Sequence, residues 1–174
     1  MADPSAWFPA RTSADRETLH AQLSAAGRAR LGGFAAPELS GRLQGGDETW
    51  TEVAGERVRA ETAPIPVAVR EALQAALADV GFALTSEPCL IRHAPGCFGL
   101  PETSGSFGFV LDLTREWWPI WGGLLLFSGG AERVEGWRPE AGALTLWRGT
   151  PPVLSMVSWG APARLAVFGT AERA

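Results

Sequence analysis

The sequence contains no lysine, asparagine or tyrosine, and it has only 2 histidines among its 174 residues. Its 15 basic residues are therefore all arginines, spread along a chain whose formal net charge is −4. They form no basic stripe of the kind that a nucleic-acid-binding surface requires, so we expect no nucleic-acid partner. Such a composition is typical of GC-rich bacterial genomes and by itself indicates no chemistry.

Long apolar runs are also lacking. No stretch of about 18 apolar residues occurs, and residues 1–10 do not form a charged segment followed by an apolar one. The sequence thus predicts neither a membrane span nor a signal peptide, and we expect a cytoplasmic location. In that compartment we expect the 2 cysteines, Cys89 and Cys97, to be reduced. The GxSxG, HExxH, P-loop and CxxC motifs of common enzyme classes are absent.

A hydrophobic content of 46% over 174 residues predicts one domain, residues 1–174, with a substantial core. Within it, residues 1–83 have the pattern of helices with supporting strands. The clearest helix covers residues 67–81, where apolar residues recur at helical spacing and Gly81 supplies the stop. An N-cap at Ser13 predicts an earlier helix that ends near Gly27. Shorter elements are expected at residues 29–34, 37–43, 49–53 and 56–60.

From residue 84 onward the apolar runs are short and are divided by glycine and proline, which is typical of an all-β sandwich or barrel. We predict strands at residues 89–93, 107–113, 123–127, 133–137, 143–147, 153–158 and 164–169. With one upstream strand, these complete a jelly roll over residues 84–174. The predicted fold class is mainly β with N-terminal helices.

Tryptophan is abundant, with 8 residues in the chain. Most of these rings are expected in the core, because burying them is strongly favourable. The segment EWWPIW differs, since Trp117, Trp118 and Trp121 surround one proline and cannot all point inward. We therefore predict an exposed apolar surface here, which either lines the barrel mouth or binds a protein partner or a second copy of the chain.

Residues 89–169 contain the stretches CLIRHAPGCFGLPETSG, FGFVLDLTREWWPIWGGLLLF and VEGWRPEAGALTLWRGTPPVLSMVSWGAPARLAVFG. These stretches resemble the 2-oxoglutarate/Fe(II) oxygenase family, specifically its prolyl-hydroxylase-like branch. Trp117 and the turn Gly122-Gly123-x-Leu125 match one family pattern, and the turn from Pro139 to Gly142 before ALTLW matches another. The resemblance implies a double-stranded β-helix, which is a cupin-like jelly roll.

The resemblance also implies where the iron ligands would lie. Family members use a His-x-Asp pair and a later histidine. Aligning on Pro101 puts Glu102 at the first position of the pair and Ser104 at the second, whereas a shift of two residues pairs Leu100 with Glu102. Neither register provides an imidazole.

The later histidine position, nine residues before Arg164, holds Ser155. Ferrous iron in this family needs two imidazoles and one carboxylate, and hydroxyl groups are poor substitutes. We therefore expect no family-type Fe(II) site. An improvised site would have to draw on His93, Glu102, Cys89 or Cys97.

Arg164 matches the arginine that binds the distal carboxylate of 2-oxoglutarate in this family. A planar, permanently charged guanidinium inside the barrel suits a carboxylate ligand. The resemblance thus implies 2-oxoglutarate or another dicarboxylate at Arg164, with Thr145 and His93 beside it. In the other interpretation, Arg164 pairs with an internal acid, such as Glu102 or Asp112, or turns outward.

The sequence therefore predicts an oxygenase-like protein that lacks the usual iron-binding triad and serves as a non-catalytic binding or accessory protein. The alternative is an active enzyme on the same scaffold. It would be either an oxygenase with an unorthodox metal site or a metal-independent catalyst. In the latter case Glu102, inside an apolar barrel, would act as general acid or base. Fold alone does not distinguish these functions.

Overall fold

The computed structural model describes residues 4–44, 49–102, 106–129 and 133–174. The helices in this part of the chain are η1 (Pro4–Trp7), α1 (Ser13–Ala26), α2 (Pro37–Gln44), α3 (Val67–Asp79) and η2 (Pro119–Trp121). The strands are β1 (Arg28–Leu31), β2 (Thr51–Ala54), β3 (Arg59–Pro64), β4 (Phe82–Leu84), β5 (Cys89–His93), β6 (Phe107–Asp112), β7 (Leu125–Ser128), β8 (Val134–Trp137), β9 (Leu144–Arg148), β10 (Val153–Leu154) and β11 (Arg164–Arg173).

Helix α1 shows how local sequence sets an element's ends. A capping box joins Thr12 and Asp15 at its start, so the N-cap is Thr12 rather than the predicted Ser13. At its end Gly27 adopts a left-handed conformation with φ of 68°, which favours glycine, and its amide donates to the Leu23 carbonyl. Strand β1 begins at the next residue, Arg28, so the end of α1 sets the position of the arginines in β1.

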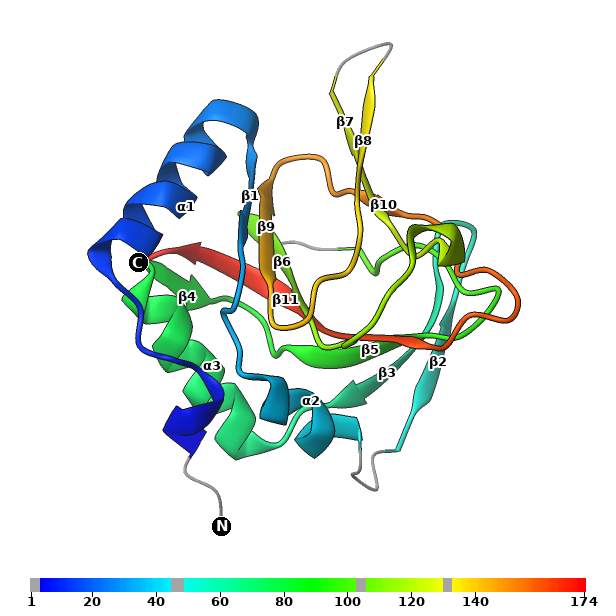
Figure 1. Ribbon diagram of the computed structural model, residues 1–174, viewed down its shortest axis with the longest axis horizontal. Coiled ribbons are helices and arrows are strands. Elements are labelled where there is room, and N and C mark those ends of the chain that lie inside the picture. Colours follow the sequence, from blue (N-terminus) through cyan, green and yellow to red (C-terminus); the bar gives the residue numbers. More distant parts are fainter. Residues whose placement is uncertain (1–3, 45–48, 103–105, 130–132) are drawn as a thin grey trace.

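The strands form two antiparallel sheets. The main sheet has the order β1-β9-β6-β11-β5-β3-β2, and β4 also pairs with β11. The small sheet has the order β10-β7-β8. Apart from the β2–β3 hairpin, strands that are neighbours in the main sheet are not consecutive in the sequence, as in a jelly roll. The β7–β8 hairpin projects from the body of the molecule (Figure 1). The predicted fold class, mainly β with helices near the N-terminus, is confirmed.

The two faces of the main sheet have different partners. On one face α1 packs against β1 and β9, and α3 packs against β4 (Figure 1). Alternation along β6 assigns its residues: Phe107, Phe109 and Leu111 belong to the helix-side core, whereas Val110 belongs to the core inside the barrel. Asp112 has the parity of Val110, so it faces the barrel interior.

A large ring fills part of that interior. The indole of Trp147 is only 2% exposed and stacks on Phe168 with 6.5 Å between ring centroids. Gly108 makes this position possible, because a Cβ atom there would lie 2.3 Å from the Trp147 ring. The part of the barrel interior around Trp147 is therefore filled with apolar side chains.

Most predicted elements are found, with three differences. Strand β4 was not predicted. The strand expected at residues 153–158 is only the two-residue β10, because the chain then makes isolated contacts such as the Gly122–Val157 bridge. The expected strand at 56–60 lies later, as β3 at Arg59–Pro64. No helix in the described residues is long and apolar enough to cross a membrane.

Candidate functional site

A cluster of buried polar side chains lies inside the barrel. It contains Arg164 of β11, Asp112 of β6, His93 of β5, Thr145 of β9 and the partly buried Arg30 of β1. The sheet register brings them together, because Arg164 pairs with His93 across one strand boundary and Thr145 pairs with Arg30 across another. All five have the parity of the barrel-facing side chains.

Arg164 and Asp112 form an ion pair at the centre of this cluster. Nη2 of Arg164 lies 2.5 Å from Oδ1 of Asp112, and both side chains are fully buried. Burial raises the pKa of Asp112, and the guanidinium groups of Arg164 and Arg30 oppose that rise. Of the two interpretations of Arg164, pairing with an internal acid is the one that is found, and the acid is Asp112.

Thr145, expected beside Arg164, instead contacts Arg30. Its hydroxyl accepts from Arg30 Nε at 3.1 Å, and Arg30 Nη1 donates to the Arg138 carbonyl at 2.9 Å. The remaining Arg30 nitrogen, Nη2, lies 4.0 Å from the second carboxylate oxygen of Asp112. Arg30 thus links the buried pair to the sheet edge.

His93, the other residue expected at the site, is fully buried. Its Nε2 lies 2.8 Å from the Gly99 carbonyl, so this nitrogen carries the proton and donates it. Burial, and secondly the nearby charge of Arg164, lowers the pKa of His93 from 6.5 to about 3. The ring is therefore neutral at physiological pH, and Nδ1 is an acceptor.

Several atoms of the cluster lack a hydrogen-bond partner within the part of the chain that the structure describes. They are Nε and Nη1 of Arg164, Oδ2 of Asp112, Nη2 of Arg30 and Nδ1 of His93. Buried polar atoms are normally paired, so this cluster is the least satisfied polar region of the barrel. The unpaired donors are arginine nitrogens, and the unpaired acceptors are Oδ2 of Asp112 and Nδ1 of His93.

Gly123 lies close to the aliphatic part of Arg164. A Cβ atom built on Gly123 would lie 3.0 Å from the Trp117 ring, 3.3 Å from Val157 and 3.4 Å from Arg164 Cδ. Trp117 and Val157 are themselves buried and form a small apolar cluster. The side of Arg164 Cδ that faces Gly123 is therefore tightly packed.

Two of the positions implied for iron ligands, Glu102 and Ser155, lie in the described residues. The Ser155 hydroxyl accepts a hydrogen bond from the Leu124 amide at 3.0 Å, which joins the residue after β10 to the residue before β7. Ser104 lies outside the described residues. Among those that are described, no group of three or more His, Cys, Asp or Glu side chains is placed to hold a metal ion. The donor set that is present therefore does not fit the family's iron centre.

Glu102 was expected inside an apolar barrel, and that expectation is wrong. Its side chain is exposed, at the rim of a shallow surface cavity of about 290 Å³ that Cys89 and Phe168 also line. A carboxylate without a cationic partner is more stable in water than in an apolar interior, which explains the position. Cys89 and Cys97 are free thiols, and burial raises the pKa of Cys89.

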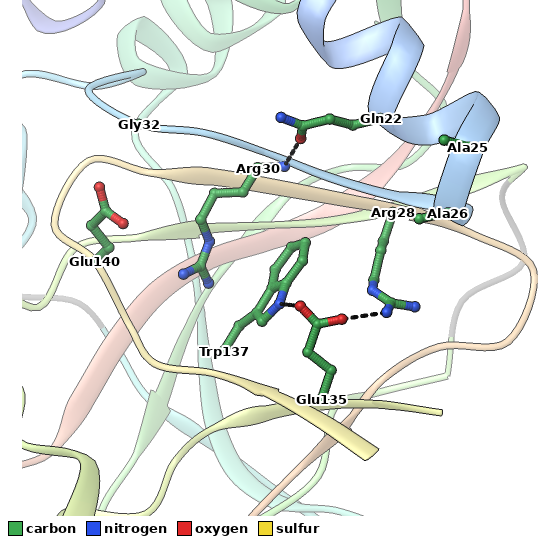
Figure 2. A pocket seen from close by; sticks show the side chains of 9 residues that line it. All are labelled: Gln22, Ala25, Ala26, Arg28, Arg30, Gly32, Glu135, Trp137 and Glu140. Atoms are coloured by element: carbon green, nitrogen blue, oxygen red, sulfur yellow. Dashed lines mark hydrogen bonds and ion pairs between the residues drawn. The ribbon is translucent and has the colours of Figure 1, made fainter. Parts of the chain in front are cut away.

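A second polar network lies at the open edge of β1 (Figure 2). It surrounds a cavity of about 630 Å³ that α1, β1 and β8 line. Glu135 forms an ion pair with Arg28 and accepts from Trp137 Nε1 at 2.7 Å. The guanidinium carbons of Arg28 and Arg30 lie 5.9 Å and 5.0 Å from the Trp137 ring centroid. The network joins the main sheet to the small sheet across the barrel opening.

Sequence reasoning missed this network, although a signal for it exists. Arg28 and Arg30 are two apart on one strand, and Glu135 and Trp137 are two apart on another, so each pair shares a face. Which strands lie opposite one another could not be read from that spacing. Because Arg28 and Trp137 both contact Glu135, the network serves best as a brace between the sheets.

The Trp-rich turn is only partly exposed. Trp117 is buried, Trp121 is half-buried against it with ring centroids 5.5 Å apart, and Trp118 is 63% exposed. The exposed apolar surface extends instead to Ile120 and to the β10–β11 connection. We call the exposed side chains of these two segments the apolar rim: Trp118, Ile120, Met156 and Trp159.

Hydrogen bonds hold the two segments of the apolar rim together. The Ser158 amide donates to the Trp121 carbonyl at 2.8 Å, and the Ser158 hydroxyl donates to the Ile120 carbonyl at 3.2 Å. The rim is therefore a defined surface built from two parts of the chain. The sequence indicated only one of these parts.

The sequence matches no family model and no curated protein. Solved structures, however, match over nearly the whole chain. A prolyl-4-hydroxylase from Pseudomonas putida has a TM-score of 0.68 at 17% identity, and the match covers 92% of this chain and 99% of that one. An oxidoreductase of the 2OG-Fe(II) oxygenase family from Burkholderia pseudomallei has a TM-score of 0.67 at 15% identity, covering 96% and 94%.

A prolyl hydroxylase from Trichoplax adhaerens, solved with a hypoxia inducible factor peptide, matches with a TM-score of 0.66 at 14% identity, covering 88% and 86%. The chain has the fold of the 2-oxoglutarate/Fe(II) oxygenases. This likeness confirms the double-stranded β-helix that the resemblance implied. Similarity at identities this low establishes the fold alone, and the function of the site has to be argued from its own residues.

Proposed function

We propose that this protein is a non-catalytic binding or accessory protein built on the oxygenase fold. The observation that carries the proposal concerns Ser155, the residue directly after β10 and one of the implied ligand positions. The Ser155 hydroxyl already accepts from the Leu124 amide, and a hydroxyl is a poor ligand for ferrous iron in any case. Glu102, at another ligand position, is exposed, and the cavity that it lines includes no residue of the buried cluster. Neither position carries an imidazole.

The apolar rim supports the binding role. Ile120 is 84% exposed and Trp159 is 79% exposed. Monomeric soluble proteins seldom leave several large apolar side chains together in water, and tryptophan is enriched at the centres of protein interfaces. We infer that the rim binds a protein, and a second copy of the chain is one candidate.

An active enzyme remains the second candidate, and His93 is the one observation that favours it. Its Nδ1 carries an unpaired acceptor inside the barrel, next to Arg164. A metal site that used this nitrogen would depart from the family pattern. Exposure of the Glu102 side chain gives no support to metal-independent catalysis inside the barrel.

Metal analysis tests the proposal directly. Purified protein reconstituted anaerobically with Fe(II) should retain substoichiometric iron by elemental analysis, and calorimetry should show no tight site. Incubation with 2-oxoglutarate and oxygen should yield no succinate above a protein-free control. Tight binding of one Fe(II) per chain, lost in His93→Ala, would overturn the proposal and make His93 a ligand.

A further inference from the structure

The buried guanidinium of Arg164 is paired with the carboxylate of Asp112. A guanidinium without solvent exposure is stable only when a negative group binds it, because an unpaired buried charge is costly. In this barrel the negative group belongs to the chain itself. It comes from β6, which pairs with β11 so that Asp112 lies opposite Ala166, two residues along from Arg164 on the same face.

Close packing borders the aliphatic part of Arg164. Gly123 lies beside its Cδ atom, and the other near neighbours of Gly123, Trp117 and Val157, are buried. Neither Arg164 nor Asp112 lines the cavity beside β1 or the one beside Glu102. The carboxylate of Asp112 already occupies the Nη2 donor of the guanidinium.

The existing pair uses only part of the donor capacity of Arg164. Asp112 contacts Nη2, while Nε and Nη1 have no partner within the described residues. The backbone of β6 fixes the direction of the Asp112 side chain. A free carboxylate of the same size could rotate and accept from two nitrogens at once, which is the stronger geometry for arginine.

We propose that Asp112 is a built-in ligand that closes the arginine site of the barrel, and that the site accepts a small monocarboxylate once the Asp112 side chain is removed. Truncation to alanine deletes a carboxylate group of about the size of formate or acetate. The inference extends the proposed function by naming the group that keeps an external carboxylate away from Arg164. It does not depend on metal content or on partner binding.

The test compares the thermal unfolding of full-length Asp112→Ala in sodium acetate, in sodium chloride of equal ionic strength and in acetamide. Acetate at about 100 mM should raise the Tm of the variant by about 3 °C or more relative to chloride, because it binds only the folded state. Acetamide should act like chloride. Wild-type protein should show no difference between acetate and chloride, since Asp112 occupies the site.

A double variant, Asp112→Leu with Arg164→Met, is the matched control. Apolar residues of similar volume can replace a buried ion pair without loss of folding. This variant should fold and ignore acetate, which would assign the response to the Arg164 guanidinium.

Removing Asp112 alone can prevent folding, so refolding yield provides a second readout. Asp112→Ala and the milder Asp112→Ser should both refold better in acetate than in chloride. The inference is overturned if wild type responds to acetate as Asp112→Ala does, or if both single variants are indifferent to acetate in stability and in refolding yield. Failure of the proposed function would appear separately, as stoichiometric iron or succinate formation by wild type.

Discussion

Burial makes His93 a residue whose protonation opposes folding. In the unfolded chain it binds a proton below pH 6.5, whereas in the folded protein its pKa is lowered to about 3. The unfolded state therefore binds more protons between these two values. The contribution of His93 to stability is complete above pH 6.5 and is lost as the pH falls toward 3. Its upper bound over the whole window is on the order of 5 kcal/mol.

We expect His93→Gln to flatten the pH dependence of the unfolding free energy. Glutamine can still donate to the Gly99 carbonyl, which His93 contacts, but it does not titrate. Urea denaturation at several values between about pH 4 and pH 7 would measure the slope. His20→Gln is the control variant. It leaves the buried ring of His93 in place, so the contribution of His93 to the pH dependence of the unfolding free energy should be unchanged. Equal slopes in wild type and His93→Gln would contradict the assignment.

At the residue scale, much of the site could be predicted from sequence, but its pairing could not. Arg164 and His93 were expected inside the barrel, and both are buried there. Asp112 was one of two candidate acids for Arg164. The choice between Glu102 and Asp112 depended on which strand lies beside β11, and that is a long-range property.

At the scale of elements, the packing of β6 against β9 depends on one missing side chain. Gly108 lies opposite Trp147, and an added Cβ atom would be 2.3 Å from the indole. The ring is 2% exposed and contacts Phe168 on its other side, so it has little room to move. The fit between these two strands is thus steric rather than a matter of strand propensity.

Gly108→Ala should destabilise the protein by about 1–3 kcal/mol through overpacking. Elsewhere in a regular strand, replacing glycine with alanine is neutral or mildly stabilising. Gly136→Ala in β8 is the matched control, because its Cβ atom would make an ordinary contact 3.4 Å from Leu126. Chemical denaturation of both variants gives the comparison. A Gly108→Ala protein as stable as Gly136→Ala would show that Trp147 can shift.

Elements with strong local signals were predicted well. Helix α3 begins at the predicted residue, Val67, and buries the periodic residues Val69, Leu73, Ala76 and Leu77. The three-residue strand β4 carries no periodic signal of its own, and it exists because β11 offers a pairing edge. Short strands of this kind are decided by tertiary contacts.

At the scale of the whole molecule, the apolar rim is the exposed surface that we propose binds a partner. Trp118→Ala and Trp159→Ala should each weaken self-association or partner binding, and a central tryptophan can contribute about 2 kcal/mol or more. Neither change should alter the Tm much, because both side chains are exposed. Sedimentation and quantitative pull-down with wild type and variants would measure the effect.

Val67→Ala provides the control for this experiment, since Val67 is 59% exposed on α3 and lies outside the rim. Trp121 is unsuitable for the test, because it packs on the buried Trp117 and its loss would damage the turn. A wild-type protein that is strictly monomeric and binds no partner would argue against the accessory role. It would favour a solitary protein whose tryptophans cover the barrel mouth.

The sequence by itself determined the class of the fold and the clearest helix, and it predicts that the familiar iron triad is missing. These depend on hydrophobic periodicity and on residue identity, which are local properties of the chain. The tertiary structure alone decided that Asp112 binds Arg164 across 52 residues of sequence, that Glu102 is exposed, and that the segment of Trp159 is hydrogen-bonded to the segment of Trp118. Such pairings depend on strand order and register, where a shift of one residue turns a side chain to the opposite face.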